Sequence, residues 1–223
     1  MQRADGGAVA REGTCGRPHG ADRVVAQVAG AARTRVSRFV LLGGTFDPIH
    51  IGHLALAREA ARVLDAIALF VIEPGHRHRV APVASLAERR RLVQHALASE
   101  PRMQEITELG IDGDLATVVS QLALLDHELH VLFGADSARH LQRWNGVQRL
   151  QPARLWVVPR SHDDGGGIDG VEVLDIDVPD VSATTVRFAL AAGRTPHGLL
   201  PSCCLADVCA VYAPVASDSL ATA

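Results

Sequence analysis

RFVLLGGTFDPIHIGHLALAREAARVL, residues Arg38–Leu64, is the stretch that decides the expected fold. It opens with the apolar run Phe39–Leu42, which has the length and composition of a buried strand. A glycine-containing turn follows, and from Leu54 apolar residues recur every three or four positions, as on one face of a helix. A strand, a glycine turn and a helix in this order place a ligand phosphate at the carboxyl edge of a parallel sheet.

The turn carries groups that suit a phosphate. Gly43 and Gly44 let the backbone approach an anion closely, and N–H groups at the following helix start point toward it. His50 and His53 are three residues apart at that helix start, so both imidazoles can face the same side. There they can donate hydrogen bonds to phosphate oxygens and stabilise charge on a leaving pyrophosphate. Each residue alone has an ordinary structural explanation, but the combination predicts a phosphate site.

The segment GGTFDPIHIGH, residues 43–53, resembles the signature of the HIGH-type nucleotidyltransferases. The bacterial nicotinate-nucleotide adenylyltransferases match it best, because every fixed position of their GGTFDPxHxGH pattern is present. Phosphopantetheine adenylyltransferases match it less well, since they usually carry Thr where His50 stands. The resemblance implies an acceptor contact from Asp47. It implies ATP contacts from Gly43, Gly44, Thr45, Phe46, His50, Gly52 and His53.

A second motif near the carboxyl end, VSATTVR at Val181–Arg187, resembles the Ile/Val-Ser-Ser/Ala-Thr-x-Ile/Val-Arg segment of the same family. Ser182 and Thr184 can cap the following helix and also donate hydroxyls to phosphate, and Arg187 projects a guanidinium one turn further on. Capping alone would explain the segment if it stood by itself. Its order and distance after the first motif favour phosphate contact, with a triphosphate held between the imidazoles and Arg187.

A third family-like pattern, G-x-D-S…L…W, begins after the predicted core strand Leu129–Phe133. Asp136 can accept two hydrogen bonds from a ribose diol or can cap the short helix that follows, and Gly134 precedes it. Trp144 is either a core residue or, as the resemblance implies, an aromatic near the acceptor's pyridine ring. The resemblance thus adds Gly134 and Asp136 to the ATP contacts and Trp144 to the acceptor contacts.

The basic loop His76–Arg79 follows the predicted strand Ile67–Ile72 and lies where the family carries a lysine. This chain contains no lysine, so Arg77 or Arg79 is expected to replace it, and the sequence leaves the choice between them open. The cluster is a candidate phosphate or carboxylate binder, and a solvated loop is the alternative.

Two predicted helices complete the expected acceptor site. The amphipathic helix Ser85–Ser99 carries Arg89 in an Arg-x-x-Leu context, which resembles the family's Arg-x-x-Met, whose arginine faces the active site. The helix Ala116–Leu125 departs from the family, because Ala116-Thr117-Val118 replaces the usual Ser-Tyr-Thr that holds the pyridine ring. Thr117 is retained as an acceptor contact, and the acceptor's identity stays open on this departure.

The alternation of strands and helices predicts an α/β fold, a Rossmann-like open parallel sheet with helices on both faces. Further strands are expected at Met103–Leu109, Ala153–Val158 and Val171–Asp177. Residues 37–214 are expected to form one nucleotidyltransferase domain. Residues 1–36, rich in Gly, Ala and Arg, are expected to be a disordered tail that activity does not need, and residues 215–223 a second tail.

Composition excludes several classes of function. The chain has 223 residues and a formal net charge of −3, which predicts neither a nucleic-acid partner nor, without a bilayer-length apolar run, a membrane protein. Its four cysteines form no CxxC pair and show no matching histidine spacing, so we predict no protein-held metal and a reducing, cytoplasmic location.

The resemblance implies transfer of AMP from ATP, carrying Mg²⁺ on its phosphates, to nicotinate mononucleotide, which yields deamido-NAD and pyrophosphate. His50, His53 and Arg187 are the expected catalytic residues, and they act by aligning the phosphates and stabilising charge. Adenylyl or cytidylyl transfer to another phosphorylated acceptor, such as nicotinamide mononucleotide, is one alternative, and a non-catalytic nucleotide-binding module is another. The choice between a monomer and a homo-oligomer stays open.

Overall fold

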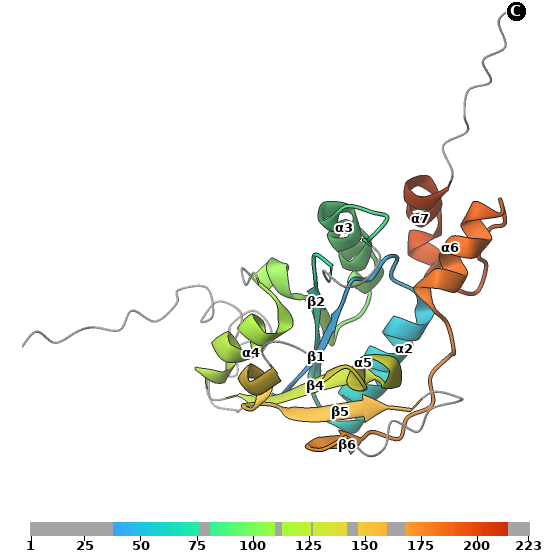
Figure 1. Cartoon of the computed structure of the whole chain (residues 1–223). Coiled ribbons are helices and arrows are strands. Elements are labelled where there is room, and N and C mark those ends of the chain that lie inside the picture. The colour runs from blue at the N-terminus through green and yellow to red at the C-terminus, as the bar shows by residue number, and fades with distance from the viewer. Residues whose placement is uncertain are drawn as a thin grey trace, which may run out of the picture.

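The computed structural model describes residues 38–75, 81–109, 113–125, 127–141, 147–159 and 168–213. The predicted tails at 1–36 and 215–223 lie outside these residues, as do Arg77, Arg79 and Trp144. Within them, six strands form one all-parallel sheet in the order β3-β2-β1-β4-β5-β6 (Figure 1). This order reverses direction between β1 and β4, the place where doubly wound sheets bind nucleotides. The prediction of a Rossmann-like parallel sheet is confirmed.

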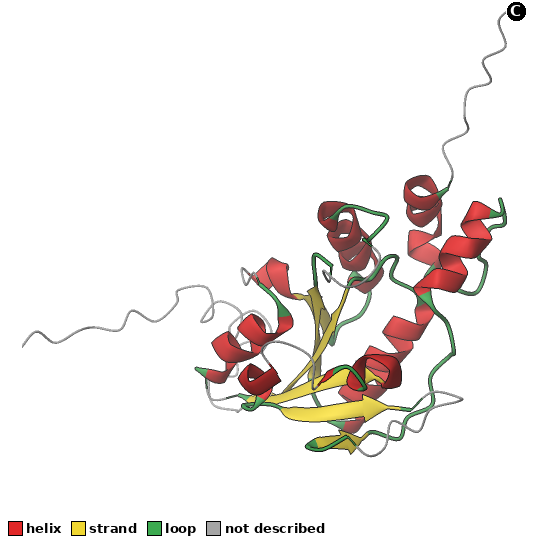
Figure 2. Ribbon diagram, in the orientation of Figure 1, coloured by secondary structure: helices red, strands yellow, loops and turns green. Residues whose placement is uncertain are grey.

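The strands are short and the helices alternate with them along the chain (Figure 2). The strands are β1 Arg38–Gly44, β2 Ile67–Ile72, β3 Met103–Glu105, β4 Glu128–Gly134, β5 Arg154–Val158 and β6 Val171–Val173. The α-helices are α2 Ile51–Val63, α3 Leu86–Leu97, α4 Leu115–Ala123, α5 Ala135–Ala138, α6 Ala183–Ala191 and α7 Leu205–Tyr212. The 3₁₀ helices are η1 Ile106–Leu109, η3 Val147–Leu150 and η4 Ser202–Cys204. None of the helices so described is long and apolar enough to cross a bilayer.

Each face of the sheet has its own apolar core. Along β1, Val40 and Leu42 pack with residues of α2, α3, α6 and α7, whereas Phe39 and Leu41 pack with residues of α4. Because both faces are covered, the central strands are apolar throughout and do not alternate with polar residues. In Figure 1, α4 lies on the left of the sheet and α2, α6 and α7 lie on the right.

The start of α3 forms as its sequence predicts. The Ser85 hydroxyl accepts a hydrogen bond from the Glu88 N–H at 3.2 Å, and the Glu88 carboxylate accepts one from the Ser85 N–H at 2.8 Å. This capping box satisfies two backbone donors that a helix start otherwise leaves without partners. The predicted helix boundary at Ser85 is confirmed.

Two predicted strands are shorter than expected. β3 ends at Glu105, whose carboxylate accepts a hydrogen bond from the Thr107 N–H at 3.2 Å and so turns the chain into η1. β6 ends at Val173, although the Leu174 N–H still donates to the Val157 carbonyl at 2.8 Å. From residue 175 the chain leaves the sheet, and it passes Pro179, which has no N–H to donate to a ladder.

A buried histidine makes stability depend on pH at the amino-terminal side of β4. The Trp156 indole N–H donates to His130 Nδ1 at 3.0 Å, and His130 Nε2 lies 3.4 Å from Glu128 Oε1. The neutral ring with its proton on Nε2 leaves Nδ1 free to accept from the indole, and a second proton on Nδ1 would displace the indole. Burial lowers the pKa of His130, and the nearby Glu128 charge only partly opposes this.

We therefore expect acid to destabilise the fold through His130. The unfolded chain takes up this proton at a higher pH than the folded chain, so the stabilisation is present above about pH 6.5 and is lost as pH falls through the lowered folded pKa. Urea unfolding at several pH values between 7.5 and 5 measures the slope. In His130→Gln, whose amide oxygen can still accept from Trp156, the slope should fall by up to about 1.4 kcal/mol per pH unit. An unchanged slope would exclude His130 as the titrating group.

Candidate active site

A pocket of about 290 Å³ lies at the carboxyl ends of β1, β4 and β5. Its described lining consists of His50, Gly52, His53, Leu56, Gly134, Val158, Pro159 and residues 175–181. Four residues predicted as ATP contacts are among them, namely His50, Gly52, His53 and Gly134. The pocket thus lies at the sheet edge and helix start where the first motif predicted a phosphate.

The two histidines of the first motif form one unit at the start of α2. His50 is the N-cap residue, and its backbone N–H donates to His53 Nδ1 at 3.3 Å. Their rings stack with centroids 3.6 Å apart and planes inclined by 22°. Because Nδ1 of His53 is an acceptor, a neutral His53 ring carries its proton on Nε2. The helix start therefore presents backbone N–H groups and two imidazoles together, which suits an anion.

The buried side chain of Phe46 packs against the ring of His53. It is buried and its ring packs edge-on against His53, with centroids 4.9 Å apart, and against Phe70 at 5.3 Å. Its backbone has φ +47°, a left-handed conformation that non-glycine residues rarely adopt and that concentrates at functional sites. The ATP contact of Phe46 stays a prediction; its side chain lies in the core and packs against His53.

Gly52 allows the pocket's two sides to meet. A Cβ at this position would lie 3.1 Å from His50 Nδ1 and 3.2 Å from the carbonyl oxygen of Pro179. Glycine thus suits the close approach between α2 and the loop 175–181, which lines the pocket.

Gly52→Ala is expected to leave the fold intact and to lower kcat/KM for ATP by roughly tenfold, because the added methyl displaces the His50 ring or the Pro179 carbonyl by a few tenths of an ångström. Gly198→Ala is unsuitable as a control, since Gly198 has φ +73°. Gly134→Ala is unsuitable as well, because Gly134 lines the same pocket and is a predicted ATP contact. His95→Ala, which removes a half-exposed side chain of α3 outside the described lining, is the control that should leave kcat/KM unchanged. A Gly52→Ala enzyme with normal kcat/KM would show that this contact does not shape the site.

Asp47 is directed into the protein. Its carboxylate accepts hydrogen bonds from the Val83 N–H at 2.8 Å, the Ala84 N–H at 3.1 Å and the Tyr212 hydroxyl at 2.7 Å. The residue is 5% exposed. The acceptor contact of Asp47 stays a prediction, and in this structure its carboxylate oxygens are engaged with protein donors.

Arg89 is likewise a buried connector. It is 1% exposed, and its guanidinium donates to the carbonyl oxygens of Thr45, Glu73, Pro74 and Ala84 at 2.5–3.2 Å. Burial lowers the pKa of Arg89 and the charge of Asp47 opposes that, so the group remains cationic at neutral pH. The acceptor contact of Arg89 stays a prediction, and in this structure the side chain joins the first motif to the loops that follow β2 and precede α3.

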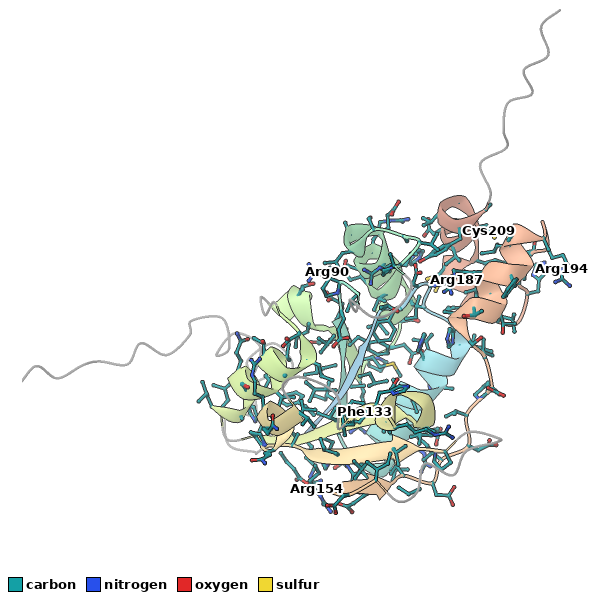
Figure 3. The ribbon with its side chains drawn as sticks, in the orientation of Figure 1. Arg90, Phe133, Arg154, Arg187, Arg194 and Cys209 are labelled. Carbon is teal, nitrogen blue, oxygen red and sulfur yellow. The ribbon has the colours of Figure 1, made fainter. Side chains whose placement is uncertain are left out.

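The second motif reaches the first one. Ser182 caps α6 by accepting from the Thr185 N–H at 3.1 Å. Arg187 Nη1 donates to the Asp47 carbonyl oxygen at 2.5 Å, and Nη2 donates to Thr184 Oγ1 at 3.2 Å. In Figure 3, Arg187 lies on the side of α6 that faces the molecule, whereas Arg194 points away at the helix end. The two motifs, 140 residues apart, are thus in direct contact.

The other predicted residues lie around the pocket or outside it. Gly43 and Gly44 end β1, and a Cβ on Gly43 would lie 2.7 Å from Leu115, so this glycine serves helix packing against α4. Thr117, in the first turn of α4, accepts from Arg149 Nη2 at 3.0 Å, outside the described lining. Asp136 lies in α5, and its side chain is not among those described.

Sequence reasoning missed one wall of the pocket. Residues 175–181, including Asp175, Asp177 and Asp180, run along it, and Val158 and Pro159 adjoin it. Val158 is paired with Gly134 in the register of β5 and β4, so a parallel neighbour of a predicted site strand was an available signal. The loop itself was hidden by the alternating pattern that predicted a strand through Asp177.

Comparison with known proteins agrees with this geometry. A cytidylyltransferase-like family model matches residues 41–189. A probable nicotinate-nucleotide adenylyltransferase of Marinobacter nauticus is 32% identical over 206 residues, covering 76% of this chain and 91% of the relative. One of Roseiflexus castenholzii is 34% identical over 176 residues, covering 69% and 86%.

Solved structures resemble the chain in fold. Plasmodium falciparum nicotinic acid mononucleotide adenylyltransferase complexed with NaAD aligns with a TM-score of 0.56 at 12% identity, over 71% of this chain and 86% of that one. A structure from Vibrio parahaemolyticus described as a putative enzyme of this kind aligns with a TM-score of 0.55 at 12% identity, over 77% and 98%. The sequence relatives and the matched family model, together with the histidine pair and its pocket, show that this chain belongs to the cytidylyltransferase-like nucleotidyltransferases and, within them, to the nicotinate-nucleotide adenylyltransferase family.

Proposed function

We propose that this enzyme transfers AMP from MgATP to nicotinate mononucleotide, releasing pyrophosphate and forming deamido-NAD. The observation that carries the proposal is the stacked His50–His53 pair at the start of α2, inside a pocket at the carboxyl edge of the sheet. The names of the sequence relatives supply the acceptor, and the cytoplasm is the proposed location, since the described cysteines are free thiols.

Electrostatics suggests how the substrates are arranged. The pocket wall at 175–181 carries three aspartates, which disfavour a phosphate and accept from amino or hydroxyl groups. The phosphates therefore belong beside His50 and His53, and the nucleoside belongs toward the aspartate wall. A Mg²⁺ that arrives on the ATP phosphates would keep phosphate oxygens and waters as most of its ligands, and it would neutralise part of the phosphate charge.

The chain's own residues then act by position and charge. The phosphate monoester of the acceptor is already anionic near neutral pH, so attack on the α-phosphorus needs no side chain to remove a proton. His53, with its proton on Nε2, would donate to a phosphate oxygen as charge grows on the leaving pyrophosphate. Arg187, held at the first motif by Asp47, would contact the same triphosphate from the opposite end of the chain.

A pyrophosphate-release assay with MgATP and a panel of mononucleotides tests the proposal. The panel includes nicotinate and nicotinamide mononucleotides, because Ala116 and Thr117 replace the residues that hold the pyridine ring in the resembled family. Fastest release with nicotinate mononucleotide supports the proposal. Faster release with another mononucleotide would assign that compound as the acceptor. ATP binding without pyrophosphate release, whichever mononucleotide is present, would indicate a non-catalytic nucleotide-binding module.

A further inference from the structure

The Asp47 carboxylate joins the first motif to the last helix of the described fold. Tyr212, at the end of α7, donates its hydroxyl to Asp47 Oδ1 at 2.7 Å, and the Ala84 N–H donates to the same oxygen at 3.1 Å. The other oxygen, Oδ2, accepts from the Val83 N–H at 2.8 Å. The carboxylate is therefore solvated by three protein donors in a site that water scarcely reaches.

Arg187 contacts the main chain of Asp47 but makes no hydrogen bond to its carboxylate. Its Nη1 donates to the main-chain carbonyl of Asp47 at 2.5 Å but stays 3.8 Å from the carboxylate oxygen Oδ2. A bidentate arginine–carboxylate pair would instead make two bonds of about 2.7–2.9 Å to the two oxygens. Oδ1 already accepts from Ala84 and Tyr212, so a bidentate pair would have to displace one of these bonds. The guanidinium instead donates to the main chain of Asp47.

We propose that Tyr212 is a positioning residue for the adenylyl transfer: its hydroxyl fixes the Asp47 carboxylate and thereby the Asp47 main-chain carbonyl, which holds the guanidinium of Arg187 in place for the triphosphate. This inference rests on the proposed function, because Tyr212 can affect turnover only if Arg187 contacts the phosphates of ATP. The Tyr212 hydroxyl donates to Asp47, 165 residues away in sequence, and acts on Arg187 through that residue.

The surroundings of Tyr212 keep its hydroxyl in place. The residue is buried, and Val208, one turn earlier on α7, belongs to the core cluster shared with α2, α3 and α6. Burial and the Asp47 carboxylate raise the pKa of the Tyr212 phenol, so it remains a hydrogen-bond donor throughout the neutral range. The donation to Asp47 is thus fixed by packing and does not depend on the pH of an assay.

Tyr212→Phe tests the inference, because it removes the hydroxyl and keeps the ring. We expect kcat to fall about tenfold, the effect of losing one hydrogen bond to a charged group, while KM for ATP changes less than twofold. In the Arg187→Ala background the same substitution should change kcat less than twofold, since its target is already gone. Val208→Ala is the matched control: it loosens α7 but keeps the hydroxyl, and kcat should stay within twofold of wild type well below its unfolding temperature.

A second measurement separates this inference from the proposed function. The ¹⁵Nε resonance of Arg187, assigned by its loss in Arg187→Ala, should shift in Tyr212→Phe and not in Val208→Ala. An unshifted resonance, an unchanged kcat, or an equal loss of kcat with and without Arg187 would each overturn the positioning role while leaving the proposed reaction standing. A wild-type enzyme that releases no pyrophosphate with any mononucleotide would instead overturn the proposed function and, with it, the catalytic role of Tyr212.

Discussion

Replacing His53 with alanine is expected to lower kcat for pyrophosphate release by about a hundredfold or more, with the fold retained. The imidazole is oriented before substrate arrives, because Nδ1 accepts from the His50 N–H and the ring is packed between His50 and Phe46. Loss of one such preorganised donor to developing charge costs roughly a hundred- to a thousandfold in rate elsewhere. Steady-state release at saturating MgATP and nicotinate mononucleotide measures the effect.

Two further variants separate chemistry from packing in this experiment. Phe46→Leu removes the edge-on ring contact but keeps the imidazole, so it should lose much less kcat than His53→Ala. His95→Ala removes a half-exposed histidine of α3 that pairs with Asp207, and it should leave kcat within twofold of wild type. A His53→Ala enzyme that keeps kcat within threefold would remove His53 from the mechanism.

The sheet and the main pocket residues could be predicted because their signals are local. A strand, a glycine turn and an amphipathic helix follow one another within Arg38–Leu64, and their order alone places His50 and His53 at the carboxyl edge of β1. The capping box of Ser85 and Glu88 is equally local, since both partners lie within four residues. Such features depend little on the rest of the chain.

The inward direction of Asp47 and Arg89 could not be predicted in the same way. Charged side chains are seldom fully buried unless they are paired, so exposure toward a ligand was the natural expectation for both. Their burial depends on partners that come together only on folding: Val83 and Tyr212 for Asp47, and the carbonyl of Thr45 for Arg89. These partners are distant in sequence and no local motif links them, so the contacts could not be predicted from the sequence.

The pocket wall at 175–181 was missed for a related reason. Alternating polar and apolar residues are typical of a half-buried strand, and the run from Val171 to Asp177 alternates. In the structure only three of these residues are in β6, while Leu174 and Val181 anchor the following loop in the core. The alternation therefore reflects a loop whose apolar residue Leu174 is buried in the core, while Asp175 and Asp177 line the pocket.

Arg89→Met is expected to lower the free energy of unfolding by about 4 kcal/mol, the largest loss of stability that we predict. The guanidinium serves four carbonyl oxygens from three separate segments, and methionine fills much of the same volume without any donor. Leaving buried polar partners unsatisfied after removing a charged group costs about 3–5 kcal/mol. Because domains of this size are stabilised by only about 5–15 kcal/mol, the variant should be close to unfolding, and urea titration at low temperature gives the measurement.

Arg91→Met provides the matched control on the same helix. Arg91 pairs with Asp207 at 3.3 Å with its side chain 54% exposed, and an ion pair so exposed contributes about 0–1 kcal/mol. A loss of less than about 1 kcal/mol in Arg89→Met, similar to that in Arg91→Met, would contradict the connecting role. Where Arg89→Met does lose stability, kcat measured on its folded fraction should fall as well, because the Thr45 carbonyl that Arg89 holds lies five residues before His50. Stability and catalysis are therefore coupled at this arginine, although it lies outside the lining of the pocket.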